Sequence, residues 1–155
     1  MKNNDKTQNI IINPNTGEIV GYTKSNNWIK INDNEQFIKL YKKSIEEVVK
    51  ILSLAEINLF NFILQYLPYQ DCILRHDNNQ FLLRKNISDK LDISLNMLDK
   101  TIRKLIKNEI IIKQCNGKEI CLIMNPFIVT NGIYIKKEFF EMFKYTKWAK
   151  LYKKS

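Results

Sequence analysis

The chain has 155 residues, of which 45% are hydrophobic, and this suits one compact globular domain with peripheral structure. The sequence contains no apolar run of the ~20 residues that span a bilayer, and residues 1–9 lack the apolar stretch of a signal peptide. These features exclude membrane-spanning and secreted classes, so we expect a cytoplasmic protein with no membrane partner.

The formal net charge of +9 is concentrated in the C-terminal half of the chain. Residues 76–125 carry 9 basic and 6 acidic side chains, and residues 126–155 carry 7 and 2. This asymmetry predicts an anionic partner that is bound by the C-terminal half.

The cysteines and the single histidine do not predict a metal site or any other cofactor. Cys72, Cys115 and Cys121 are odd in number and lack C-x-x-C spacing, so we expect reduced and mostly buried thiols rather than a disulfide or a zinc site. His76 has no partner at metal-ligand spacing and stands among polar residues, which is typical of a solvated loop.

The first 34 residues are predicted to form an appendage built on a β-hairpin. Strands are expected at 10–13 and 18–22, because Pro14 and Gly17 supply the backbone angles of the turn between them. Residues 24–34 are interpreted as a loop with a short strand.

A short strand at 37–41 is followed by two predicted helices. Ser44 with Glu47 three residues later is the pattern of a capping box that opens the first helix. Ser53 with Glu56 repeats the pattern. The second helix is strongly apolar from residue 54 to Leu67 and should end at Pro68, and it is interpreted as either the core or a dimer face.

The segment from 85 to 124 has the element order of a winged helix-turn-helix. A polar connection and a short strand are expected before it, at 71–79 and 80–83. The predicted elements are a helix at 85–91, a turn at 92–94, a helix at 95–108, and strands at 110–114 and 120–124 around Asn116-Gly117, with Asn125-Pro126 as the stop. The predicted fold class is therefore α+β, a winged helix-turn-helix domain over residues 35–150 that ends in a helix at 135–145.

The helix at 95–108 has an apolar face and a basic face. Its apolar side comprises Leu95, Leu98, Ile102, Leu105 and Ile106. The opposite stripe comprises Asn96, Lys100, Arg103 and Lys107, flanked by Met97 and Lys104. Ser94 is the expected N-cap, and the first turn of such a helix reaches base edges in the major groove.

The chemistry of this stripe fits double-stranded DNA. Arg103 can bind guanine and Asn96 can bind adenine through paired hydrogen bonds, whereas the three lysines suit phosphates. The predicted wing adds Lys113, Gln114, Asn116 and Lys118, which could touch the backbone or the minor groove. The alternatives are a merely solvated helix face and a winged helix that binds only protein.

The segment 144–155 is interpreted as a basic-aromatic tail. Its five lysines have no acidic neighbour within the segment, and Tyr145, Trp148 and Tyr152 lie between them. One interpretation is an accessory nucleic-acid contact. The other is a solvated end whose aromatic side chains pack back on the domain.

Residues from Phe37 to about Lys150 resemble the RepL-type replication-initiation proteins of small plasmids and phages of Gram-positive bacteria. The resemblance rests on FIKLY (37–41), ISDKLDISLNMLDKTIRKLIKNEIII (87–112) and LIMNPFIVTNG (122–132). The second segment is shared with many transcription regulators, whereas the third is the more specific sign. Glu109 departs from the pattern, because such helices usually end in glycine.

The resemblance implies that the protein recognises a replication origin and recruits host replication proteins. It does not imply a nicking or polymerase activity. The sequence also has no phosphate-binding G-x-x-x-x-G-K-[ST] loop and no histidine pair for a nicking site, so we expect that the protein is not an enzyme. A transcription regulator and a protein-binding adaptor remain the alternative functions. The sequence leaves the oligomeric state open, although helix-turn-helix proteins commonly act as homodimers on two half-sites.

Overall fold

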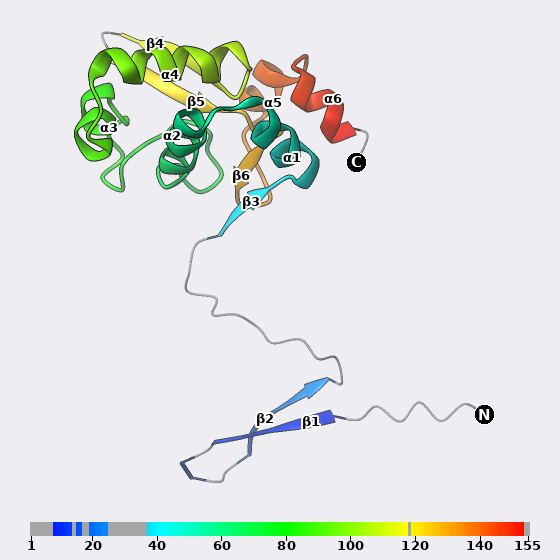
Figure 1. Ribbon diagram of the computed structural model, residues 1–155. Coiled ribbons are helices and arrows are strands. Elements are labelled where there is room, and N and C mark those ends of the chain that lie inside the picture. Colours follow the sequence, from blue (N-terminus) through cyan, green and yellow to red (C-terminus); the bar gives the residue numbers. More distant parts are fainter. Residues whose placement is uncertain (1–7, 14, 17–18, 25–36, 118, 154–155) are drawn as a thin grey trace. The chain divides into compact units, whose positions relative to one another are not determined.

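The computed structural model describes residues 8–13, 15–16, 19–24, 37–117 and 119–153 (Figure 1). The chain divides into two compact units, Met1–Glu35 and Gln36–Ser155. In the first unit, β1 (Gln8–Ile12) and β2 (Ile19–Lys24) form an antiparallel pair, which confirms the predicted hairpin. The short strand expected within 24–34 lies outside the described residues, except that Lys24 ends β2.

The second unit is a mixed helix and sheet structure, so the α+β class is confirmed (Figure 1). Its described part contains six helices and two small antiparallel sheets. The elements are, in chain order, β3 (Ile38–Leu40), α1 (Lys42–Ile51), α2 (Leu54–Leu64), α3 (Arg84–Leu91), α4 (Leu95–Lys107), β4 (Ile111–Asn116), β5 (Glu119–Met124), β6 (Val129–Asn131), α5 (Lys137–Phe143) and α6 (Lys147–Lys153).

Two predictions about α1 and α2 need correction. Ser44 does not cap α1, because the helix already begins at Lys42, and the buried Ser44 hydroxyl donates to the Phe127 carbonyl at 2.8 Å. The helix α2 ends at Leu64 rather than Leu67. The Ser53 cap is confirmed, since its backbone N–H donates to Glu56 at 2.8 Å.

The apolar face of α2 forms the centre of the core. Leu59, Phe60, Ile63 and Leu64 are buried there, and α2 packs against α4. This packing decides between the two interpretations of the helix in favour of the core. Each fully buried aliphatic side chain of this kind contributes about 1.5–3 kcal/mol relative to an exposed one.

The segment before α3 pairs with β5 at the edge of the β4–β5 hairpin. Leu74 N–H donates to the Leu122 carbonyl at 2.9 Å, and Met124 N–H donates to the Cys72 carbonyl at 2.8 Å. The predicted polar connection at 71–79 therefore begins with buried, strand-like backbone. The predicted strand at 80–83 does not form; Phe81 makes only an isolated bridge to Arg75.

The two faces of the β4–β5 hairpin are covered by different helices. Lys113 and Leu122 are paired across the strands and line a cleft with Ile102 of α4. Gln114 and Cys121 are the next pair and line a different cleft with Phe139 of α5. Because successive side chains of a strand point to opposite faces, α4 and α5 lie on opposite sides of the hairpin.

The C-terminal segment forms two helices instead of the one predicted at 135–145. The first, α5, is shorter than expected and buries Phe139 and Phe143. The second, α6, occupies the segment interpreted as a tail, and it buries Trp148 and Ala149. In the described part of the chain, no helix has the length and hydropathy needed to cross a membrane.

Candidate nucleic-acid interface

A tight turn between α3 and α4 sets the start of α4. Asp92 ends α3 in the left-handed conformation with φ of 51°, and the Ser88 hydroxyl donates to the Ile93 carbonyl at 2.6 Å. Ser94 then accepts a hydrogen bond from Met97 N–H at 3.2 Å, so the predicted N-cap is confirmed. Because the Ser94 hydroxyl caps the helix, it fixes where the next residues lie.

The inner face of α4 holds the helix on the core. Leu98 and Leu105 are fully buried and Ile102 is 6% exposed, as the periodicity predicts. The periodicity also predicts that Leu95 is buried, and this is wrong, because its side chain is 45% exposed. Residues 94–97 are all exposed, so no other described element of the second unit covers the first turn of α4.

The outer face of α4 carries the predicted DNA-binding side chains. The exposed residues are Asn96, Met97, Lys100, Arg103, Lys104 and Lys107. Arg103 donates from Nε to the Asp99 carbonyl at 3.2 Å, a contact that uses only one nitrogen of its guanidinium group. The structure thus gathers these six residues on one side of a helix whose opposite side is buried.

In the hairpin beside α4, Lys113 and Gln114 are both exposed on β4. Only Lys113 lines the cleft with α4, whereas Gln114 lines the cleft on the α5 side. Its turn uses Gly117 at φ of 65°, a conformation that glycine adopts without strain. Asn116 ends β4 opposite Glu119, and nothing is described of its side chain. Lys118 lies outside the described residues, so its predicted contact is not placed.

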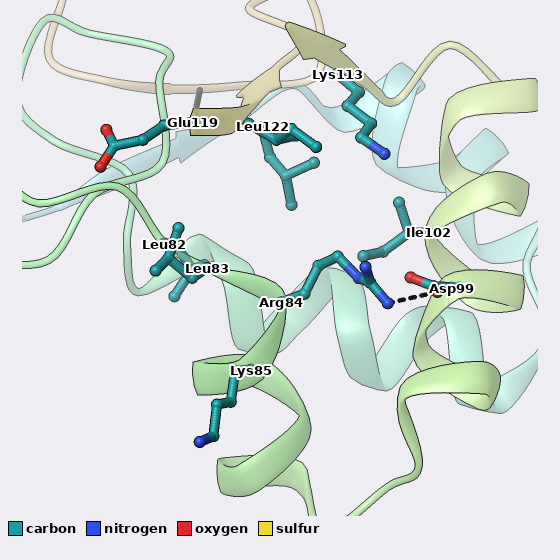
Figure 2. Close-up of a pocket in the computed structure, with 10 residues that line it drawn as sticks. Leu82, Leu83, Arg84, Lys85, Asp99, Ile102, Lys113, Glu119 and Leu122 are labelled. Carbon is teal, nitrogen blue, oxygen red and sulfur yellow. Dashed lines mark hydrogen bonds and ion pairs between the residues drawn. The ribbon is translucent and has the colours of Figure 1, made fainter. Parts of the chain in front are cut away.

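A cleft of about 370 Å³ separates α4 from the hairpin and from the start of α3. Figure 2 shows Arg84 reaching across it to Asp99, with Lys113 pointing into the same space from the strand. The Arg84 guanidinium contacts the Asp99 carboxylate at 2.6 Å. This ion pair neutralises the acidic side chain at the margin of the basic stripe.

Arg84 and Lys85 also belong to the candidate interface, although the sequence analysis did not identify them. Both are exposed in the first turn of α3 and both line the cleft. A basic pair at the start of the predicted helix 85–91 was the available signal. Its position beside α4 depends on the packing of α3 against α4.

None of the cysteines, nor His76, lines the cleft beside α4. All three thiols are free; Cys72 and Cys121 are buried and Cys115 is exposed, in agreement with the expectation that most of the thiols are buried. Burial, aided by Asp71, raises the pKa of the Cys72 thiol to about 12. His76 is half-buried rather than solvated, because its ring packs edge-on against Tyr66 at 5.2 Å.

Comparison with known proteins gives one clear relationship. No curated protein and no solved structure matches the chain. The family model of the Firmicute plasmid replication protein (RepL) matches residues 2–151. This match starts well before Phe37, so the N-terminal unit is part of the family pattern as well. The chain therefore belongs to the RepL family of Firmicute plasmid replication proteins.

Proposed function

We propose that this replication protein is a cytoplasmic, sequence-specific DNA-binding protein that acts by binding rather than by catalysis. It recognises the origin of its plasmid or phage through a winged helix-turn-helix made of α3, α4 and the β4–β5 hairpin. The proposal rests on one observation: all exposed charges on the outer face of α4 are positive, while the inner face of the same helix is buried in the core.

The geometry of α4 suits insertion into the major groove. Its first turn is uncovered, so Asn96 and Met97 can approach base edges without a clash with the rest of the domain. Lys113 flanks α4 on the hairpin, and Arg84 and Lys85 flank it at the start of α3. Phosphates on either side of the groove are the natural ligands of such flanking cations.

Binding to duplex DNA should weaken steeply as salt rises. Each phosphate contact releases condensed counterions, so the logarithm of the association constant should fall by roughly 0.9 per contact against the logarithm of salt concentration. Fluorescence anisotropy with an origin duplex and a scrambled duplex at several salt concentrations measures this slope. An affinity independent of salt, or no binding to the DNA of its own replicon, would contradict the proposal and favour a protein-binding adaptor.

Base readout and phosphate contact should be separable along α4. We expect Arg103→Ala to weaken binding to the cognate site by ~1–3 kcal/mol and to relax the base preference at one position. We expect Lys107→Ala, in the last turn, to weaken binding to cognate and scrambled duplexes equally and to lower the salt slope by about one.

The same anisotropy titrations on both duplexes test this division. Lys107→Ala is the matched control for Arg103→Ala, because both remove one exposed positive charge from the same helix. Equal losses on cognate and scrambled DNA for Arg103→Ala would refute base readout by this residue.

A further inference from the structure

The helix α6 is fixed to the C-terminal end of α4. The buried Trp148 donates from Nε1 to the Asn108 carbonyl at 2.8 Å, directly after the last residue of α4. Lys147 N–H donates to Glu109 Oε2 at 3.1 Å. Asn125 donates to the Glu109 carbonyl at 2.8 Å. The residues that follow α4 and the first residues of α6 therefore form one hydrogen-bonded junction.

This junction gives a structural role to Glu109, the second residue after the end of α4. Glu109 has φ of 58°, in the left-handed region that glycine usually occupies at a helix end. Glycine would remove the strain but also the carboxylate that accepts the Lys147 N–H. The carboxylate of Glu109 thus lies at the point where α6 joins α4.

The exposed side of α6 carries a second stripe of lysines. Lys147, Lys150 and Lys153 recur at every third position and are exposed, whereas Trp148 and Ala149 face the core. Residues spaced by three lie on one side of a helix. Tyr152 packs against Tyr41 at 5.2 Å, so the aromatic side chains hold α6 on the domain while the lysines face outward.

If α4 inserts into the major groove as proposed, its length places this stripe beyond the groove. At ~1.5 Å per residue the 13 residues of α4 span roughly 20 Å, whereas the major groove is about 12 Å wide. If the first turn reads bases, the last turn lies at the phosphate wall. The lysines at 147 and 153 are then about 9 Å apart along α6, enough to face two or three phosphates of one strand.

We propose that α6 is a second DNA-contacting element, in which Lys150 and Lys153 bind backbone phosphates that flank the site read by α4. This inference rests on the proposed DNA-binding function. Lys144 is not part of the contact, because it is paired with Glu141. The packed aromatic residues hold α6 rigidly on the domain. The contact by α6 therefore lengthens the DNA site only on the side of the C-terminal end of α4.

The test compares Lys150→Ala and Lys153→Ala, singly and together, with Lys137→Ala. Lys137 is an exposed lysine on α5, the helix on the side of the hairpin away from α4. Each α6 variant should bind cognate and scrambled duplexes roughly three- to tenfold more weakly and lower the salt slope by about one, whereas Lys137→Ala should match the unaltered protein. Melting temperatures should be unchanged, because all three side chains are exposed.

Hydroxyl-radical footprinting of the origin duplex supplies a second readout. The double variant should lose protection at one flank of the footprint and retain the protection contributed by α4. If the unaltered protein shows a steep salt slope and the double variant keeps both its slope and its footprint, the contact by α6 is refuted while the proposed function stands. If the unaltered protein does not bind DNA at all, both proposals fall.

Discussion

Replacing Trp148 with alanine is expected to lower the free energy of unfolding by about 3–5 kcal/mol. The indole is fully buried, and its Nε1–H donates a hydrogen bond to the Asn108 carbonyl. Alanine would leave a cavity between α6 and the end of α4, and it would leave the carbonyl without that donor. Urea unfolding followed by circular dichroism measures the change.

Two variants separate the parts of this effect. Trp148→Phe retains most of the buried volume but loses the donor, so it should cost only about 1–3 kcal/mol. Tyr145→Ala removes an aromatic side chain that is 82% exposed, and its effect should stay within about 0.5 kcal/mol. A Trp148→Ala variant as stable as Tyr145→Ala would show that α6 does not pack on the domain in solution.

Replacing Leu98 with alanine is expected to destabilise the protein by about 2–5 kcal/mol. Leu98 is fully buried on the inner face of α4, which packs against both α2 and α3. The cavity would lie under the helix that we propose inserts into DNA. Thermal unfolding followed by circular dichroism should therefore show a lower melting temperature.

The neighbouring residue provides the control for Leu98→Ala. Met97 is adjacent in the chain but 47% exposed, so Met97→Ala should change the melting temperature much less. An equal loss of stability in the two variants would mean that the inner and outer faces of α4 are wrongly assigned. DNA affinity of Leu98→Ala, measured well below its melting temperature, should remain close to that of the unaltered protein, because Leu98 is not on the outer face.

Most of the region from α3 to β5 was predictable from the sequence, because its signals are local. Helical periodicity located α4 to within one residue at its end, and Ser94 marked its start. Asn116-Gly117 predicted the hairpin turn at the right place, although Asn116 is the last residue of β4 and pairs with Glu119, and Gly117 has the positive φ of the turn. The separation of a basic face from a buried face on α4 follows from the same periodicity. The DNA contacts assigned to that face stay predictions.

The errors concern residues whose state depends on distant parts of the chain. Ser44 matched a capping pattern, yet its hydroxyl is buried against the Phe127 carbonyl, 83 residues away. Leu95 matched the apolar face of α4 but is exposed, because none of the described elements of the second unit covers the first turn. The segment 72–75 has few strand signals of its own, and it is strand-like only because the edge of β5 offers it hydrogen-bonding partners.

The sequence by itself determined the order of the elements from α3 to β5, the two faces of α4 and the excess of positive charge in the C-terminal half. Periodicity, capping and turn chemistry act over a few residues, and charge can be counted. Only the tertiary structure decided that Arg84 neutralises Asp99 beside α4, and that Trp148 joins α6 to the end of α4. These pairs lie 15 and 40 residues apart in the chain, so the packing of the core, and not any local pattern, brings them together.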